Sequence, residues 1–303
     1  MLLHDRYAII GVFQKSKGVT PIAIRIITDS TSDITQAMAG ELGIDVLPLT
    51  VSFGNDDYTD GVTITLSEFY NKLREAKQPP KSTQVNPEAF RAVFERHAAN
   101  GDSVVCLFIA SKLSGTYQSA CIAKEECGDA DIYIIDSENT TLALKLLVLE
   151  SIRMRDEGKT AAEIAGTIRS IVPRLMICAA IDTLKYLVMG GRLSTVSGAM
   201  GQLMGIKPLI EVTGGIIEVK KKARGTKKAH QAVVEMAIEN GIDTAYSVIL
   251  GHTDCPEELV TFKAQFEQLS GIADALTSDI GVTVGTHAGP GCVGIAFIKR
   301  TSL

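Results

Sequence analysis

The chain has 303 residues, of which 46% are hydrophobic, and a formal net charge of -5. This length allows a substantial buried core, and the acidic balance without any Trp argues against a general nucleic-acid-binding protein. No apolar run reaches the roughly 18 residues of a membrane-spanning helix, so we expect a protein that is not integral to a membrane. Six Cys residues without metal-ligand spacing favour reduced thiols in a cytoplasmic protein and no metal site.

The beginning of the chain differs in pattern from the rest, and we interpret residues 1–23 as an N-terminal extension rather than a secretory signal. From residue 24, short β-branched runs alternate with segments of helical period. The predicted strands are RIITDS, DVLPLTVSF, VVCLFIA and IYIIDS; the predicted helices include TLSEFYNKLREA, PEAFRAVFERHAANG and YQSACIAKEE. This alternation is typical of βαβ units, so residues 24–158 are predicted to form an α/β domain with a mostly parallel sheet.

The second half of the chain has a different pattern. Two apolar runs flank Thr213-Gly214-Gly215 and predict a β-hairpin, which a purely parallel sheet would not contain. Further strands are predicted at MICAAID, YSVILGHTD and GIAFIK. Residues 159–303 are therefore predicted to form a mixed α+β domain.

Hydroxyl-bearing residues come directly after several of the predicted strands, where open α/β sheets commonly bind ligands. Ser30 follows the first strand and Ser114 lies in the SKLSGT segment after VVCLFIA. Such residues are often only helix N-caps. SKLSGT is longer than a cap requires, however, and Ser114 followed by Gly115 can present a hydroxyl and backbone N–H groups to an anion.

A polar loop with prolines at both ends is predicted to join two helices at residues 79–87. Asn86 and Pro87 are explained as the start of the second helix. Ser82 and Thr83 are not explained by helix capping, and the stiff loop could hold their hydroxyls in place. They are therefore candidate ligand contacts.

The segment GTHAGPGCVG, residues 285–294, places His287 among glycines. Glycine permits a close approach to the backbone, and an imidazole near neutral pH can donate a hydrogen bond to a carboxylate. A structural histidine is the simpler alternative. We interpret the glycines as making room for a ligand head group, with His287 as one of its donors.

Five segments in this order and spacing resemble the DegV family, which includes the fatty-acid-binding subunit of bacterial fatty acid kinase. They are Ile27–Asp33, Ser82–Gln84, Leu113–Tyr117, Gly190–Ser194 and Thr286–Gly291. The resemblance covers about residues 24 to 299. It implies a two-domain α/β protein that holds one long-chain fatty acid between its domains. It also implies a separate ATP-binding kinase subunit that phosphorylates the carboxylate for phospholipid synthesis, with no catalysis or other cofactor in the binding subunit.

The resemblance also implies roles for individual residues. Ser114 matches the Ser of the SGTY motif and His287 the His of the THxGPG motif, and both resemble carboxylate ligands. Ser82 is the third, with Thr83 as a substitute, although Val85 stands where the family usually has Pro. Further candidate contacts with ligand or partner are Ser30, Gly115, Arg192 and Gly289. A transient membrane contact for loading the fatty acid is expected as well.

A different class of function is a serine hydrolase, since Ser114, a strand-end Asp and His287 occur in the chain order of an α/β-hydrolase triad. The nucleophile motif of that fold needs Gly where this chain has Lys112 and Thr116. No P-loop sequence for ATP is present either. The basic run at residues 220–228 is explained as a solvated strand end, or alternatively as a docking patch for an acidic partner.

Overall fold

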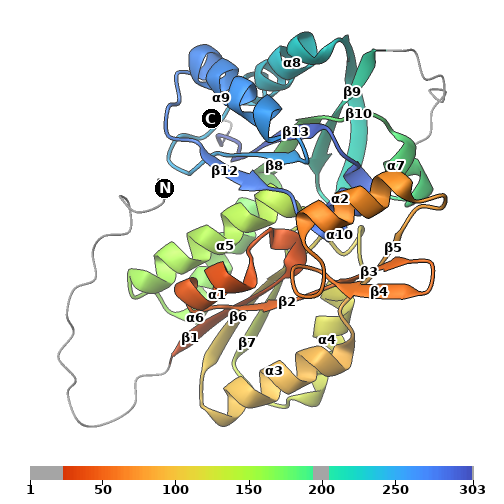
Figure 1. Ribbon diagram of the computed structural model, residues 1–303. Helices are drawn as coiled ribbons and strands as arrows, with labels where there is room; N and C mark the ends of the chain where they lie inside the picture. Colours follow the sequence, from red (N-terminus) through yellow and green to blue (C-terminus); the bar gives the residue numbers. More distant parts are fainter. Residues whose placement is uncertain (1–22, 194–204, 302–303) are drawn as a thin grey trace.

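Two β-sheets in different halves of the molecule organise the chain (Figure 1), and the computed structural model describes residues 23–193 and 205–301. Residues 1–22 of the predicted N-terminal extension, and Ser194, lie outside these residues. The division into domains at residue 158 stays a prediction; this position lies in the turn between α5 (Thr141–Asp156) and α6 (Ala161–Ile171).

The first sheet is parallel and has the strand order β2-β1-β6-β7. Its strands are β1 (Ile24–Asp29), β2 (Asp45–Leu47), β6 (Ser103–Phe108) and β7 (Ile132–Asp136). Every residue of β6 is buried, as expected for a central strand covered on both faces. The parallel α/β arrangement predicted from the sequence is confirmed.

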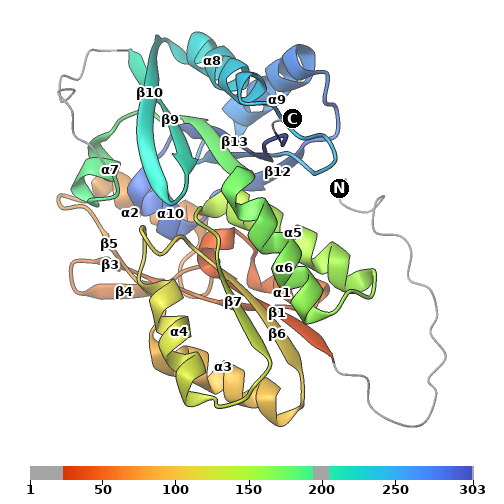
Figure 2. The ribbon, with the colours of Figure 1, turned by 180° about the vertical axis from the view of Figure 1, so that it is seen from behind.

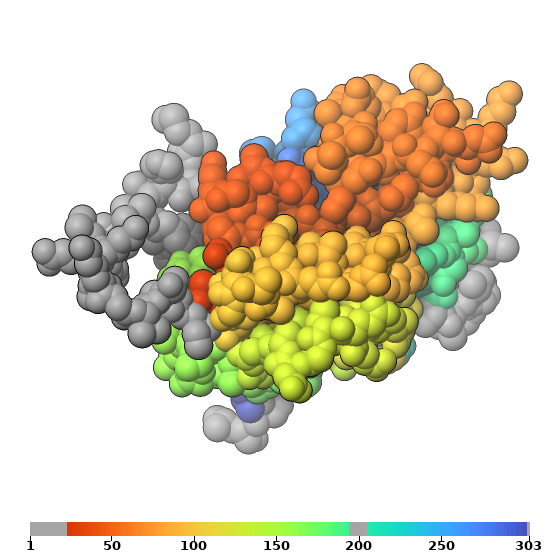
Figure 3. All heavy atoms as spheres, turned by 90° about the horizontal axis from the view of Figure 1, so that it is seen from below, coloured from red at the N-terminus to blue at the C-terminus, as the bar shows by residue number. Residues whose placement is uncertain are grey.

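Helices cover both faces of the parallel sheet. On one face, α3 (Pro87–Ala99) and α4 (Thr116–Glu126) lie side by side (Figure 3). On the other, α5 and α6 contact β6 and connect to the second half of the chain (Figure 2). The helix α1 (Gln36–Leu42) packs on β2, and a short 3-10 turn, η1 (Ser30–Ser32), comes directly after β1.

The second sheet has the order β10-β9-β8-β13-β11-β12, antiparallel except for the pair β11–β12. Its strands are β8 (Leu175–Ala180), β9 (Ile206–Thr213), β10 (Ile216–Arg224), β11 (Ile249–Thr253), β12 (Leu276–Asp279) and β13 (Cys292–Ile298). Gly214 and Gly215 form the predicted hairpin turn with φ of 58° and 71°, the left-handed values that such turns require. The mixed sheet is thus confirmed.

The second sheet is also covered on both faces. The helices α8 (Thr226–Glu239) and α9 (Pro256–Ser270) pack on its outer face. The inner face contacts α5, which therefore lies between the two sheets (Figure 1). The short elements η2 (Val172–Arg174) and α7 (Lys185–Met189) flank β8.

A third, three-stranded sheet corrects two of our predictions. The run DVLPLTVSF is not one strand: β2 ends at Leu47, and β3 (Thr50–Phe53) pairs in a separate antiparallel sheet with β4 (Asp56–Thr59) and β5 (Lys81–Thr83). The prediction of a plain loop at residues 79–87 was wrong as well, because Ser82 pairs with Val51 and Thr83 with Thr50. Edge pairing thus fixes the hydroxyls that were expected in a loop. The helices α2 (Leu66–Glu75) and α10 (Val282–Ala288) pack next to this sheet.

Candidate functional site

A cavity of about 280 Å³ lies between the two halves of the chain. Its volume is near the lower end of the range usual for small-molecule sites. Aliphatic side chains from the inner face of the second sheet form one wall: Ile177, Ala179, Ile210, Val212 and Ile217, together with Cys292 and Gly294. Opposite them lie Leu49, Ile109, Leu113 and Leu142 from the first half. Most of the cavity is therefore apolar.

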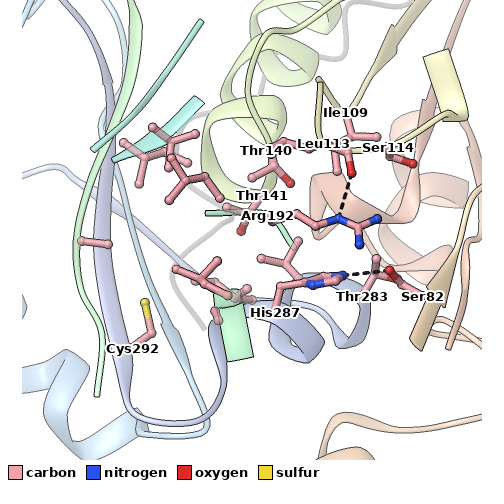
Figure 4. A pocket seen from close by; sticks show the side chains of 18 of the residues that line it. Ser82, Ile109, Leu113, Ser114, Thr140, Thr141, Arg192, Thr283, His287 and Cys292 are labelled. Atoms are coloured by element: carbon pink, nitrogen blue, oxygen red, sulfur yellow. Dashed lines mark hydrogen bonds between the residues drawn. The ribbon is translucent and has the colours of Figure 1, made fainter. Parts of the chain in front are cut away.

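Polar side chains gather at one end of the cavity (Figure 4). They come from four separate elements: Ser82 from β5, Ser114 from the segment before α4, Arg192 from the segment after α7 and His287 from α10. Thr83 and Gln84 line the same end and are exposed, so this end reaches solvent. The four side chains that the sequence nominated from distant segments line one end of one cavity.

His287 is paired with Ser82 at the centre of this end. The Nε2 atom of His287 lies 2.8 Å from Ser82 Oγ. Its Nδ1 atom is buried and has no hydrogen-bond partner among the described residues. Burial, and in addition the nearby Arg192 guanidinium, lower the pKa of His287 to about 4. At neutral pH the ring is uncharged and can donate from one nitrogen and accept at the other.

Gly190 explains the position of the His287 ring. A Cβ atom at Gly190 would lie 2.2 Å from His287 Nδ1, so no other residue type fits beside the imidazole in this place. Gly289 has a related role: its φ is 72°, and a Cβ there would collide with the Tyr186 ring. Gly289 does not line the cavity, and its positive φ forms the end of α10.

Ser114 and Gly115 precede α4. Ser114 Oγ lies 3.0 Å from Thr116 Oγ1 and accepts from the Thr116 amide at 3.3 Å. A Cβ at Gly115 would lie 1.9 Å from Gln84 Oε1, so this glycine lets the Ser82 segment approach α4. Both Ser114 and Gly115 line the cavity, while the His287 imidazole hydrogen-bonds Ser82 instead of Ser114.

Val85 stands where the resemblance led us to expect a proline, and two hydrogen bonds hold this segment in place. The amide of Val85, which a proline would lack, donates to Thr116 Oγ1 at 3.4 Å. Next to it, Gln84 Nε2 donates to Ser119 Oγ at 2.8 Å. The valine side chain itself is buried against Phe90 and its neighbours. The segment is thereby fixed against α4 without the proline.

Arg192 brings a positive charge to the polar end. Its Nε donates to the carbonyl of Leu113 at 3.2 Å and its Nη1 to the carbonyl of Gly190 at 2.5 Å. These two contacts join the Ser114 segment to the segment after α7. The guanidinium has further N–H groups that these carbonyls do not use, and such groups bind carboxylates well.

Two carboxyl groups, that of the buried Asp60 and that of the partly buried Asp33, hold α10, the helix that carries His287. Asp33 Oδ1 accepts from the Gly281 amide at 2.8 Å, and Asp60 Oδ2 accepts from the Thr283 amide at 3.1 Å. Ser30, a candidate ligand contact in the sequence, donates to Asp60 at 3.0 Å and does not line the cavity. We call these interactions, made by Ser30, Asp33 and Asp60 with Gly281 and Thr283, the α10 clasp.

The carboxyl groups around the α10 clasp have unusual acidities. Burial raises the pKa of Asp33 to about 7 and the pKa of Asp29 to about 6, although hydrogen bonds oppose the shift in both. The Lys145 ammonium lies nearby and donates to the Asp33 carbonyl and to Ser278 Oγ. Burial likewise raises the pKa of Asp60. A buried carboxyl group that binds a proton loses its charge, and this lowers the free-energy cost of burying it.

Sequence reasoning missed several of these contributors. Gln84 and Thr283 line the cavity, and Asp60 positions α10. Asp60 lies in a polar segment that reads as a turn, so its burial depends on packing between distant parts of the chain. The sequence held one indication of the Gln84 contact, namely Gly115, because a glycine inside a polar segment often allows another side chain to approach the backbone closely.

The basic run lies on β10 and the start of α8. The β10 strand is at the edge of its sheet, where lysines commonly discourage pairing with other chains. Lys220 contacts Glu211 and Glu218, and Lys221 contacts Glu239. Lys222 and Arg224 are exposed. These glutamates therefore neutralise part of the positive charge of residues 220–228.

Two further features concern metals and membranes. Within residues 23–193 and 205–301, no group of three or more His, Cys, Asp or Glu side chains is placed to hold a metal ion. No helix in this same part of the chain has both the length and the apolar character needed to cross a bilayer. The six cysteines are free thiols, three of them buried.

Several solved structures have the same fold. One is a DegV family protein from Thermus thermophilus described for its fatty acid binding; it has a TM-score of 0.83 and 27% identity, covering 92% of this chain and all of that one. Another is a stearic acid-binding protein from Eubacterium ventriosum, with a TM-score of 0.81 and 29% identity over 90% of this chain and 97% of that one.

The amino-acid sequence has close relatives too. A DegV domain-containing protein from Caldanaerobacter subterraneus subsp. tengcongensis is 39% identical over 278 residues, which cover 91% of this chain and 99% of the relative. Another from Clostridium acetobutylicum is 34% identical over the same shares of both chains. The family model described as "Uncharacterised protein, DegV family" matches residues 23–300. The chain therefore belongs to the DegV family.

Proposed function

We propose that this protein binds one long-chain fatty acid in the cavity, with the acyl chain against the aliphatic wall and the carboxylate at the polar end. The observation that carries this proposal is the division of a single cavity into a long apolar part and one end with Ser82, Ser114, Arg192 and His287. Solved relatives of the same fold that are described as fatty-acid-binding proteins support it.

The polar end offers donors suited to a carboxylate. If His287 Nε2–H donates to Ser82, the hydroxyl hydrogen of Ser82 is left for the ligand, and the pair acts as one donor. The Arg192 guanidinium supplies the charge, and the neutral imidazole avoids burying a second cation. Ser114 provides a further hydroxyl at this end, and Thr83 another at the exposed rim.

The apolar part supplies most of the binding energy. Burial of roughly 14 methylenes at about 0.8 kcal/mol each gives a gross driving force near 11 kcal/mol before the costs of association. A hydrogen bond to a charged group contributes only about 1.5–3 kcal/mol. The acyl chain therefore holds the ligand, and the polar end orients it.

The second part of the proposal concerns the fate of the bound fatty acid. We propose that the carboxylate is presented to a separate ATP-binding kinase subunit, which phosphorylates it to an acyl phosphate for phospholipid synthesis. This rests on the resemblance to the fatty acid kinase subunit, on the exposed position of Thr83 and Gln84 beside the head-group residues, and on the missing P-loop. Such a role implies a cytoplasmic protein that loads fatty acid during transient contact with a membrane.

The experiment extracts ligand from protein purified from a bacterial host and identifies it by mass spectrometry. We expect a non-covalent long-chain fatty acid at near one-to-one occupancy. Protein that is empty, and that takes up no long-chain acid afterwards, contradicts the binding proposal. The kinase role is tested separately: ATP should be consumed only when the kinase subunit and fatty acid are both added, and ATP turnover by this chain alone contradicts it.

The serine hydrolase remains as a second candidate because a Ser–His pair exists. The pair is Ser82 with His287, however, while Ser114 contacts Thr116. No carboxylate accepts from His287 Nδ1 among the described residues, so the orienting third member of a triad has no counterpart there. Covalent labelling of Ser82 or Ser114 by a fluorophosphonate would favour the hydrolase.

A further inference from the structure

Thr140 occupies the N-cap position of α5 without capping the helix. A threonine in this position usually accepts a hydrogen bond from an amide in the first helical turn. Here the Ala143 amide donates to the Thr140 carbonyl at 3.2 Å, and the Thr140 hydroxyl makes no cap bond. Thr140 is only 7% exposed, and its Oγ1 is buried without a partner among the described residues. An unpaired buried hydroxyl is destabilising, which calls for an explanation.

The Thr140 hydroxyl belongs to the cavity. Thr140, Thr141 and Leu142 all line it, and in Figure 4 Thr140 lies between Arg192 and the aliphatic residues of the second sheet. Thr141 is fixed by a hydrogen bond from its own hydroxyl to Asp33, so it is not a free donor. Thr140 is thus a polar group in the wall beyond the head-group residues.

The start of α5 adds to this polarity. The helix has 16 residues, and the amides of Thr141 and Leu142 have no hydrogen-bond partner in the part of the chain that the structure describes. Unpaired amides and the helix dipole make the first turn of a helix favourable for an oxygen lone pair. A hydroxyl group on a ligand could accept from such a donor or donate to Thr140 Oγ1.

We propose that Thr140 forms an oxygen-binding subsite within the cavity, and that the protein accepts long-chain fatty acids with a hydroxyl group on the acyl chain near the carboxyl end. This inference rests on the proposed fatty acid binding and specifies its ligand class. The carboxylate itself is directed to Ser82, His287 and Arg192, which leaves Thr140 for a second oxygen of the same molecule. The unpaired amides at the start of α5 make this part of the wall polar, and the Thr140 hydroxyl makes the directional hydrogen bond to the ligand oxygen.

The test compares Thr140→Val, which keeps the shape and removes the hydroxyl, with Thr140→Ser, which keeps the hydroxyl. The probes are hexadecanoic acid and hydroxyhexadecanoic acids that carry the hydroxyl at successive carbons from C2 to C10. For each variant, the Kd of each hydroxy acid is divided by the Kd of hexadecanoic acid. For at least one isomer, we expect this ratio to rise about tenfold to a hundredfold in Thr140→Val and to stay near the parent value in Thr140→Ser.

Three results would overturn the subsite. One is an unchanged ratio in Thr140→Val for every isomer while hexadecanoic acid binds. Another is a rise of this Kd ratio in Thr140→Ser as large as that in Thr140→Val, which would point to side-chain shape and not to the hydroxyl. The third is a crystal structure of the complex in which a water alone contacts Thr140 Oγ1, although such a water would need further polar partners in an aliphatic wall. A parent protein that binds none of the acids would instead reject the proposed function itself.

Discussion

The two ends of the cavity are built in different ways. The aliphatic wall comes from neighbouring strands of one sheet, with residues two apart on each strand, such as Ile177 and Ala179 on β8. The polar end is assembled from four elements that span the chain from Ser82 to His287. Regular strand geometry alone positions the wall, because alternate side chains face the same side. The polar end depends on contacts between distant segments.

This difference separates affinity from orientation. The wall contributes binding energy in proportion to buried area, so the loss of one group weakens binding gradually. Under the proposed function, the polar end contributes less energy but orients the carboxylate, and chemical steps are sensitive to displacements of about 1 Å. Changes at the two ends should therefore produce different ratios of lost binding to lost turnover.

The largest expected effect is on kinase-coupled turnover in His287→Ala, Ser82→Ala and Ser114→Ala. Loss of one hydrogen bond to the carboxylate should weaken fatty acid binding roughly tenfold to a hundredfold. Turnover at saturating fatty acid should fall further, on the order of a hundredfold, because the carboxylate is no longer held for attack. Titration with fatty acid and a coupled ATP assay measure the two quantities, with circular dichroism as the check of folding. Variants that bind and turn over like the parent would remove these residues from the site.

A smaller effect is expected from one substitution made at each end, Gly190→Ala and Gly294→Ala. The new Cβ at position 190 would lie 2.2 Å from His287 Nδ1, whereas at position 294 it would lie 3.2 Å from Ala179 Cβ. Gly190→Ala should displace the imidazole and lower turnover by about tenfold or more at saturating fatty acid. Gly294→Ala should lower affinity for long chains by about fourfold, the equivalent of one methylene, with little loss of turnover. If both variants lost affinity and turnover to the same extent, the two ends of the cavity would not differ in their roles.

The smallest effect concerns the α10 clasp and its dependence on pH. Because the pKa of Asp33 is raised to about 7, the folded protein holds a proton that the unfolded chain has released. The free energy of unfolding should therefore fall as pH rises from about 4 to about 7, and it should level off once Asp33 is ionised in the folded protein as well. Asp33→Asn should lack this component in urea unfolding between pH 5 and pH 8.

The pKa of His287 is lowered to about 4, so its contribution to stability changes with pH in the opposite direction to that of Asp33. The unfolded chain then takes up a proton first, so this residue lowers stability as pH falls below about 6.5. His287 is present in both the parent and Asp33→Asn, so the difference between their profiles over the interval from pH 5 to pH 8 reports Asp33 alone. Identical pH profiles for the parent and Asp33→Asn would show that this carboxyl does not titrate in the interval.

Much of the fold could be predicted from local patterns. The apolar and β-branched runs indicated the strands of both sheets except β12, and Thr213-Gly214-Gly215 predicted the hairpin. The break between β2 and β3 was missed although Pro48, which cannot donate to a strand ladder, interrupts the apolar run at that point. Strands of three or four residues such as β5 also carry too little periodicity to distinguish them from loops.

Some residues of the candidate site could be predicted from the sequence and others could not, for a physical reason. Ser82, Ser114 and His287 were nominated through motifs, and the structure places them at one end of one cavity. Asp60 and Thr140 were not nominated, because in the sequence they resemble a turn residue and an ordinary helix cap. Their roles arise only when segments more than 100 residues apart pack together, such as Asp60 with Thr283. Local sequence carries no signal for such contacts.

The α10 clasp has a kinetic consequence. The cavity is lined by both halves of the chain, and Asp33 and Asp60 join the first half to the start of α10 in the second. If the proposed fatty acid leaves by separation of the two halves, these contacts must break first. The lifetime of the loaded state is then set by how often this junction opens, independently of how tightly the acyl chain is held. Under the proposed function, a junction that opens rarely would keep the fatty acid from the surrounding water until a partner docks.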